Sequence, residues 1–451
     1  MGEAAKISLK AIGKQDTYLL SKDPEDSFFN YTLPKQHSEF RKYHRVKDVF
    51  NPGQIGNWPF GQTIKVQFNP TNMGDLLSNM WLSVTMPGIA YGNYADQLGR
   101  HLLKSITMFV DDIEVEKIHD DWGIIYDELY LEMSEKVANR FLVNRGLGYD
   151  ESPQNATIAR SNSDLVIPLH FFFSRKYASD EYSSNKPNRP YFPVCAAFRQ
   201  KIEFELEFHK QTFFTGPDDI EDTVDTIFLP SFKLITEEIT VSAEERLYLK
   251  NGKHTLVTDL VRKHPTAVSE LNTNIIKNNL VPNIPVKCIH WFLRNTDFEN
   301  ANVAVGNDLN VETLNFQNRF NFSSNVNFDQ LQTFFNPIME SASFYINGNK
   351  LPNVSNTNHN YYKYLIASKN RLARPYRNIY TYSFSMNPVN VEPSGNLDFS
   401  QIQSDKTNIE VTLNTSPGSL VDIATKTYSL HMYYTGYQTF TFEGGFMSIA
   451  Y

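Results

Sequence analysis

Apolar and acidic residues alternate without a break in the segment Ile202-Glu203-Phe204-Glu205-Leu206-Glu207-Phe208. Successive side chains of a β-strand point to opposite faces, so this pattern predicts a strand with one apolar face and one face of glutamates. A glycosidase needs two carboxyl groups that approach the substrate from opposite sides, whereas these glutamates form a row on one face. We therefore interpret the segment as a half-buried strand whose acidic face is solvated.

Further strand-like segments occur along the chain, and turn residues separate them. The segment 63–68 alternates and ends at Asn69-Pro70, and the segment 82–86 ends at Pro87-Gly88. Two more such segments meet at Asp111-Asp112, which predicts a hairpin. The chain has 33 Phe, 24 Tyr and 22 Pro among its 451 residues, and aromatic residues favour pleated, half-buried surfaces. The sequence therefore predicts an all-β protein built from β-sandwiches.

The order of elements in the first half of the chain recurs in the second half. A helix is predicted from about 120 to 136, directly after the first hairpin, because its apolar residues keep helical spacing. The second half has an Asn347-Gly348 hairpin followed by a helical segment over 358–372. Strand-like segments follow each helix, at 165–173 and 202–208 in the first half and at 380–386 and 408–413 in the second.

Two copies of one β-sandwich are the simplest account of this repeated order. A chain of 451 residues is too long for one compact core and suits two domains. We place the boundary close to Glu244-Glu245-Arg246, where the last strand-like segment of the first half ends. The predicted divisions are an N-terminal arm at 1–26, a first sandwich at 27–242 and a second at 243–451.

The charge distribution argues against direct nucleic-acid binding. The net charge is −8, and the longest basic patch is the short segment 41–47. Proteins that neutralise nucleic acid directly carry dense Lys and Arg arms, because phosphate contacts supply most of the affinity. We interpret 41–47 as a solvated or subunit-facing segment.

The two cysteines, Cys195 and Cys288, lie far apart within apolar segments. We expect both to be buried free thiols, which excludes a disulfide framework and agrees with a reducing compartment. No segment has the length of apolar sequence that a transmembrane helix needs, and the first residues lack the layout of a secretory signal.

Catalytic and metal-binding patterns are missing from the sequence. The eleven His residues show no metal-ligand spacing, no Gly-rich phosphate loop follows a strand, and no G-x-S-x-G motif occurs. We therefore expect a protein that is not an enzyme and that has no cofactor or metal. Asn-x-Ser/Thr patterns, which mark possible glycosylation, occur at Asn30, Asn155, Asn321, Asn353 and Asn414.

Five short motifs, in order along the chain, carry a resemblance to a known family. The first combines G-x-Q-D-x-Y-L with P-x-x-[ST]-F-F and contains Gly13, Gln15, Asp16, Tyr18, Leu19, Phe28 and Phe29. The second is a helix motif, D-W-x-x-x-[WY]-x-E-L, which contains Asp121, Trp122, Tyr126, Glu128 and Leu129. The third is Glu244-Glu245-Arg246. The fourth is similar to P-S-G-x-x-N-F-S-R-I and contains Pro393, Ser394, Gly395, Phe399 and Ser400, and the fifth is the segment 437–451.

These motifs resemble those of the major capsid proteins of nucleocytoplasmic large DNA viruses. The resemblance implies two tandem eight-stranded jelly-roll β-sandwiches (a double jelly roll) with short helices in loops. It also implies homotrimers that form pseudo-hexagonal capsomers and tile the icosahedral capsid of a large double-stranded DNA virus. Implied partners are neighbouring capsomers, minor capsid and penton proteins and inner viral membrane proteins, in a virion assembled in the host cytoplasm. The chain departs from the family at 253–260, which keeps little of the usual H-E-Y-L-I-E-Q, and in the Asn-rich region 295–360.

We expect structural roles for the motif residues. The segment 15–20 should be an extended arm under the body or against a neighbouring chain, Trp122 and Tyr126 should pack the helix onto the first sandwich, and Gly395 should adopt a positive φ. The alternatives are a minor capsid or penton protein, which would favour a single jelly roll, and a jelly-roll carbohydrate-binding protein. A jelly-roll glycoside hydrolase would need two convergent carboxylates.

Overall fold

The computed structural model describes most of the chain from residue 39 onward. The described residues are 39–49, 58–91, 93–95, 97–143, 162–175, 190–216, 226–227, 232–299, 319–325, 336–355 and 357–450. From Phe40 onward they belong to one compact unit.

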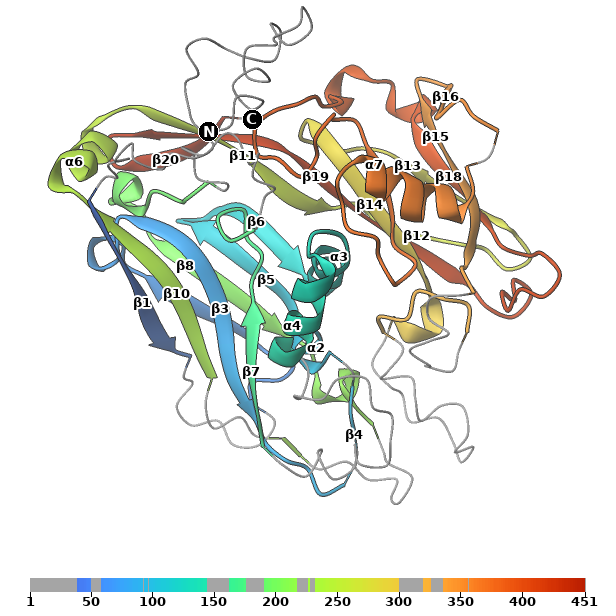
Figure 1. Cartoon of the computed structure of the whole chain (residues 1–451), viewed down its shortest axis with the longest axis horizontal. Coiled ribbons are helices and arrows are strands. Elements are labelled where there is room, and N and C mark those ends of the chain that lie inside the picture. The colour runs from blue at the N-terminus through green and yellow to red at the C-terminus, as the bar shows by residue number, and fades with distance from the viewer. Residues whose placement is uncertain are drawn as a thin grey trace, which may run out of the picture. The chain divides into compact units, whose positions relative to one another are not determined.

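The first half of the chain forms two antiparallel four-stranded sheets (Figure 1). One sheet has the order β1 (Phe40–Asp48), β10 (Phe232–Val241), β3 (Leu76–Met86), β7 (Ser163–Pro168). The other has the order β2 (Thr63–Phe68), β8 (Ile202–Phe208), β5 (Leu103–Val110), β6 (Ile113–His119). The predicted alternation of β8 is confirmed, because its apolar residues are buried and its glutamates are partly exposed.

The second half forms two sheets with the same order. One is β11 (His254–Lys263), β19 (Tyr428–Glu443), β14 (Val286–Asn295), β17 (Tyr380–Ser383). The other is β13 (Ile275–Asn279), β18 (Asn408–Leu413), β15 (Met339–Ile346), β16 (Asn349–Leu351). Two short strands add to β19, namely β12 (Ala267–Val268) and β20 (Phe446–Ala450). Apart from these additions and a two-residue pair, β4 (Asn93–Tyr94) with β9 (Thr215–Gly216), each half is an eight-stranded jelly roll.

Hairpin turns lie where the sequence predicts them. Asp111 joins β5 to β6 with a φ of 51°, and its side chain accepts a hydrogen bond from the Lys201 N–H. Asn347 and Gly348 join β15 to β16 with φ values of 51° and 79°. Both turns need left-handed backbone, which Asp, Asn and Gly adopt at low cost.

The helix predicted over 120–136 is two helices. Its first part is α3 (Asp120–Leu129), which ends where Tyr130 donates its N–H to the Tyr126 carbonyl. A second helix is α4 (Met133–Val143). Its Glu135 side chain accepts a hydrogen bond from the N–H of Glu132, the residue before the helix. The sequence prediction was wrong because helical spacing continues through this break, whereas the capping contacts end one helix and start another.

The remaining helices are short. They are α2 (Leu98–Leu102), α6 (Ala243–Asn251), the π-helical turn η8 (Tyr361–Ile366), α7 (Ala367–Lys369) and the 3-10 turns η2 (Pro70–Asn72), η3 (Val194–Ala197), η4 (Gln211–Phe213), η5 (Thr296–Phe298), η9 (Phe399–Gln401) and η10 (Ser404–Lys406). Within the described ranges, no helix is long and apolar enough to cross a membrane.

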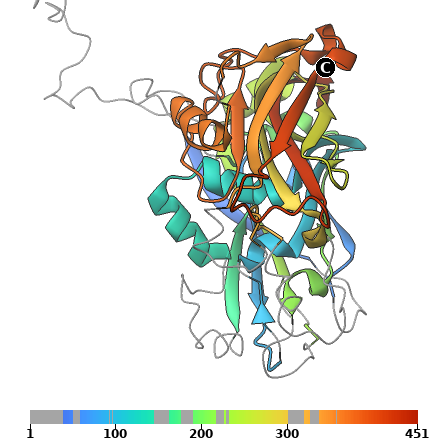
Figure 2. The same ribbon diagram turned by 90° about the vertical axis from the view of Figure 1, so that its right-hand side faces the viewer.

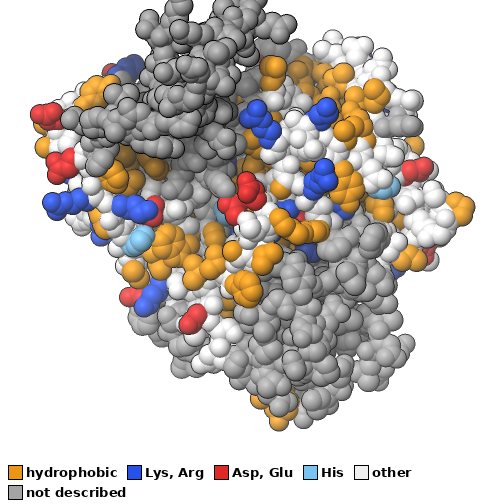
Figure 3. Space-filling model, in the orientation of Figure 1, with side chains coloured by type: hydrophobic (Ala, Val, Ile, Leu, Met, Phe, Trp, Pro, Cys, Tyr) orange, Lys and Arg blue, Asp and Glu red, His pale blue; other side chains and the backbone are white. Residues whose placement is uncertain are grey.

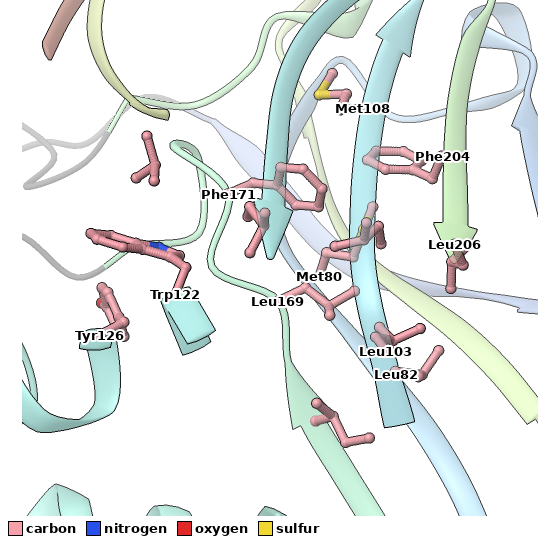
Figure 4. Close-up of a cluster of buried hydrophobic side chains, with 14 of the residues drawn as sticks. Met80, Leu82, Leu103, Met108, Trp122, Tyr126, Leu169, Phe171, Phe204 and Leu206 are labelled. Atoms are coloured by element: carbon pink, nitrogen blue, oxygen red, sulfur yellow. The ribbon is translucent and has the colours of Figure 1, made fainter. Parts of the chain in front are cut away.

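Each sandwich has an apolar core between its sheets. Figure 4 shows part of the first core, where Phe171 and Phe204 face Met80 and Met108, while Trp122 and Tyr126 lie to one side on α3. This core continues into the second half of the chain through residues such as Phe292, Phe322 and Tyr433. The two sandwiches therefore share a packed contact, and Figures 1 and 2 show α3 beside the second sandwich.

Both cysteines are buried free thiols, as the sequence predicts. Burial raises the pKa of Cys195 to about 12 and of Cys288 to about 11. Such thiols are chemically inert in the folded protein, because the reactive species is the thiolate.

Candidate functional site: the buried ionic contact between the sandwiches

Helix α3 carries four carboxylates, two at each end. Three belong to residues that are almost completely buried, and Asp127 is partly buried. Asp120 and Asp121 occupy its first turn, and Asp127 and Glu128 follow seven residues later on the same face. Buried carboxylates need charged or hydrogen-bonding partners, because an unpaired charge in the interior is very costly. The partners come from both sandwiches, so α3 connects them.

At the start of α3, both carboxylates pair with arginines of the second half. Arg319 donates to Asp120 Oδ2 from Nε at 2.8 Å and from Nη2 at 2.6 Å, and His209 Nε2 lies 2.9 Å from the same oxygen. Arg294 donates to Asp121, which also accepts from the Tyr433 hydroxyl at 3.3 Å. The helix N-terminus itself favours negative charge at these positions.

The electrostatics of this end keep Asp120 ionised. Burial alone would raise its pKa, but Arg319 and His209 outweigh burial and hold the pKa well below its usual range. Arg294 is completely buried and also donates to Glu299 at 2.9 Å. Burial opposes this charge, yet Asp121 and Glu299 raise the Arg294 pKa further above its already high value.

At the other end of α3, the partners come from both halves. Arg100 binds Asp127 in a bidentate manner, with N–O distances of 2.8 and 2.9 Å, and His170 lies 3.4 Å from the same carboxylate. Glu128 accepts a hydrogen bond of 2.7 Å from the Tyr376 N–H of the second half. Arg377, also from the second half, lies 3.7 Å from Glu128.

A second ionic cluster joins strand β6 to strand β11. Glu116 is fully buried and accepts hydrogen bonds of 2.9 Å from the N–H groups of Phe172 and Val261, and a further one from Arg175. Arg175 also donates to the Asp259 carbonyl at 2.9 Å, and Lys287 pairs with the Asp259 carboxylate at 3.1 Å. Burial raises the pKa of Glu116 although Arg175 and the two N–H groups favour its charged form.

Aromatic rings fill the space beside the ion pairs. The Trp122 ring lies 5.9 Å from His290 and 6.1 Å from Tyr433, both in the second sandwich. Tyr126 stacks on His170, at 3.8 Å, within the first sandwich. Both rings belong to the core of the first sandwich, as expected, and Trp122 also contacts the second sandwich because α3 lies between the two.

The other motifs also have structural roles where the structure describes them. Ser394 donates its N–H to the Tyr437 hydroxyl at 3.1 Å, and its own hydroxyl exchanges hydrogen bonds with the backbone of Asn387. Gly395 has a φ of 127°, which confirms the predicted positive value. Phe399 is buried in the second core, whereas Pro393 and Ser400 are exposed. This motif therefore fastens a loop to β19.

Several predicted positions lie outside the described residues. They are the domain 1–26, Asn30, Asn155, and the motif residues Gly13, Gln15, Asp16, Tyr18, Leu19, Phe28 and Phe29. Among the described sequons, Asn353 is exposed and Asn414 is half-buried, whereas Asn321 is fully buried and donates to the Asn325 carbonyl at 2.7 Å. A glycosyltransferase does not reach a buried amide, so the folded chain disfavours Asn321 as an acceptor.

The arrangement fixes the positions of the charged side chains. The carboxylates of α3 are already bound to Arg, Tyr or backbone N–H donors. Two of the three β8 glutamates pair across strands, with Lys65–Glu205 at 3.2 Å and Lys104–Glu207 at 2.5 Å. No group of three or more metal-ligating side chains occurs among the residues that the structure describes. Arg319 was not predicted because it lies in the Asn-rich region 295–360, where no motif was found, and Arg294, directly before that region, belongs to no motif either.

Two jelly rolls with the same strand order, joined by this buried contact, define a double jelly-roll protein. Family comparisons agree: a profile described as the major capsid protein N-terminus matches residues 37–246, and one described as the large eukaryotic DNA virus major capsid protein matches residues 245–447. The chain belongs to the family of major capsid proteins of nucleocytoplasmic large DNA viruses.

Individual relatives are distant in sequence. Capsid protein 1 of Acanthamoeba polyphaga mimivirus is 22% identical over 63% of this chain, and the match spans 48% of that protein. The major capsid protein of Pyramimonas orientalis virus is 25% identical over 63% of this chain and 64% of its own length. That of Paramecium bursaria Chlorella virus 1 is 20% identical over 98% of both chains. The match therefore spans about half of the mimivirus protein and just under two thirds of the Pyramimonas orientalis virus protein.

Solved structures show the same fold. VP54 of PBCV-1 superposes with a TM-score of 0.69 at 17% identity, over 94% of this chain and 100% of VP54. The major capsid protein of Faustovirus superposes with a TM-score of 0.62 at 11% identity, over 92% of each chain.

Proposed function

We propose that this chain forms homotrimeric, pseudo-hexagonal capsomers that tile the icosahedral shell of a large double-stranded DNA virus. The observation that carries the proposal is the pair of jelly rolls with identical strand order in one chain. Three such chains arranged around an axis present six similar edges, which suits packing on a hexagonal lattice. Jelly rolls also leave few open strand edges, which limits uncontrolled association.

The proposed partners are further copies of the same capsomer, minor capsid and penton proteins, and inner viral membrane proteins. The proposed site of action is the virion, after assembly in the host cytoplasm. A net charge of −8 supports the absence of direct contact with the genome. The sequestered carboxylates of α3 and β6 support a structural protein without catalytic activity. The divisions at 1–26, 27–242 and 243–451 are proposed as its domains.

The mass of the native protein in solution tests this function. Light scattering on a sizing column should give three times 51.9 kDa, and the value should persist on dilution. A stable monomer would overturn the proposal, and screens for sugar binding would then follow. A penton or minor capsid protein would favour a single jelly roll, whereas this chain has two.

A further inference from the structure

The two corresponding sheets of the chain differ in what covers their outer faces. Every residue of β14 is buried, so both faces of that strand are covered. Strand β3, the third strand of the equivalent sheet in the first sandwich, alternates between buried and partly exposed residues. Among the described residues, the outer face of the sheet β1-β10-β3-β7 is thus open at β3, whereas that of β11-β19-β14-β17 is closed at β14.

The first sandwich closes the outer face of the second sandwich with two elements. The helix that follows β6 covers β14: Asp121 of α3 pairs with Arg294, and Tyr130 bonds His290 Nε2 at 3.0 Å. Strand β6 itself meets the edge strand β11, because Glu116 accepts a hydrogen bond of 2.9 Å from the Val261 N–H. A jelly roll of this chain therefore binds the next one through its fifth strand and the helix after it.

The second sandwich has the same two elements, and within the chain their outward residues are left exposed. The helical segment η8–α7 follows β16 as α3 follows β6. Its Tyr364 and Leu365 side chains are 40% and 49% exposed. Large apolar side chains in this position cost solvation free energy unless something covers them.

The open sheet carries a matching apolar row. Val46, Ile235, Trp81 and Pro168 are register partners across β1, β10, β3 and β7. Val46 is 54% exposed, and the other three are half-buried on the outer face. The His44 ring packs edge-on against Trp81 at 5.2 Å, and the neighbouring Lys42 is neutralised by Glu237 at 2.8 Å. The row therefore lies beside a charged residue, Lys42, that is already paired within the chain.

We propose that η8–α7 of one chain docks on the outer face of the sheet β1-β10-β3-β7 of a second copy. This inference rests on the proposed trimer and names its subunit contact: the packing of α3 on β14 within the chain is repeated between chains. The contact is heterologous, so one copy offers the helix surface (Tyr364, Leu365) and its neighbour offers the sheet surface (Val46, Trp81, Ile235, Pro168). Heterologous contacts close into rings when the rotation between neighbours permits.

Two further features support a second copy as the occupant. The helix surface is continuous with the contact inside the chain, because Lys363 of η8 donates to the Tyr376 carbonyl at 2.8 Å and the Tyr376 N–H donates to Glu128 of α3. Hydrophobic side chains over β1, β10 and β3 and over η8–α7 are visible on the same face in Figure 3. Both surfaces are therefore open on one side of the chain, where each can meet a neighbouring copy.

Charge insertion tests the contact. Leu365→Asp and Val46→Asp place a carboxylate in the helix surface and the sheet surface, at positions exposed enough to leave folding intact. Leu420→Asp is the control, because Leu420 is 53% exposed and belongs to neither surface. We expect light scattering to show monomers for the first two variants, with affinity weakened roughly 100-fold or more, and trimers for the control. If the two variants have equal melting temperatures as isolated monomers, misfolding is excluded as the cause of their dissociation.

Mixing the two monomeric variants distinguishes a heterologous contact from other kinds. The Leu365→Asp chain keeps an intact sheet surface and the Val46→Asp chain keeps an intact helix surface, so the mixture should form one-to-one dimers that neither variant forms alone. If the wild type is trimeric and both variants stay trimeric, or if mixing gives no dimer, this contact is wrong while the capsomer proposal stands. A monomeric wild type would instead overturn the proposed function.

Discussion

Replacement of Asp121 by alanine tests whether buried ion pairs around α3 hold the sandwiches together. Asp121 is fully buried and accepts hydrogen bonds from Arg294 and from the Tyr433 hydroxyl. The substitution leaves the buried Arg294 guanidinium with Glu299 as a carboxylate partner. Removing one member of a buried pair typically costs about 3–5 kcal/mol, because the other charge remains buried. We therefore expect a loss of this size in the free energy of unfolding.

The loss should be measurable as a change in melting temperature. An unfolding entropy of about 2.1 cal/mol/K per residue, over roughly 400 residues, gives about 0.85 kcal/mol/K, so the melting temperature should fall by about 4–6 °C. Calorimetry at one fixed protein concentration is the assay, because subunit association also contributes to stability. Arg294→Met and the double variant complete the cycle, and the double variant should be more stable than Asp121→Ala alone.

The control is an exposed pair of similar geometry. Lys253 and Glu443 lie 3.0 Å apart with both side chains 66% exposed. Glu443→Ala should change stability by less than about 1 kcal/mol, since solvent screens exposed pairs. If Asp121→Ala is no more destabilising than Glu443→Ala, or if the two substitutions in the cycle are additive, the buried pair does not have the role assigned to it here.

Three further predictions follow from other parts of the interior. Burial lowers the pKa of His101 and His290 to about 3 and of His170 to about 4, below the ordinary 6.5. Below pH 6.5 the unfolded chain therefore binds more protons than the folded chain. The free energy of unfolding is highest above that pH and falls by about 2 kcal/mol per histidine at pH 5. Equal melting temperatures at pH 7 and pH 5 would contradict this. Gly436→Ala places a methyl group 2.5 Å from the Pro285 carbonyl oxygen and should cost about 1–3 kcal/mol. Gly348→Asn should cost less, because nothing lies within 4 Å and Asn tolerates the positive φ of 79° better than other side chains. Cys195 and Cys288 should react with a thiol reagent at pH 8 only after denaturation, and fast labelling of the native protein would refute their burial.

Local patterns in the sequence predicted several of the strands and turns of this fold. The segment 63–68 is β2 with the predicted bounds, and the alternation at 202–208 is β8. The hairpins at Asp111 and Asn347 form because these residue types accept left-handed backbone. Such features depend on neighbours in sequence, so a single sequence contains the information.

The contact between the sandwiches depends on residues that are distant in sequence, and the local patterns did not predict it. Strand β14 contains Lys287, His290 and Arg294, which suggest a solvated face, yet the whole strand is buried. The reason is that Asp121 and Asp259, far away in the chain, supply the compensating charges. Five motifs identified the family and marked α3, but the partners of its carboxylates had to come from the structure.

A polar contact between two jelly rolls has a different consequence from an apolar one. Apolar surfaces slide against each other at little cost, whereas bidentate and buried ion pairs are satisfied in a narrow range of orientations. The pairs of Asp120 and Asp121 with Arg319 and Arg294, together with the Tyr376 N–H on Glu128, anchor both ends of α3 to the second sandwich. Both ends must stay in place for either sandwich to keep its position, so rotation about α3 is opposed at two separated points. A unit that repeats around an axis needs such a fixed angle, because small errors accumulate over the six sandwiches of the proposed ring.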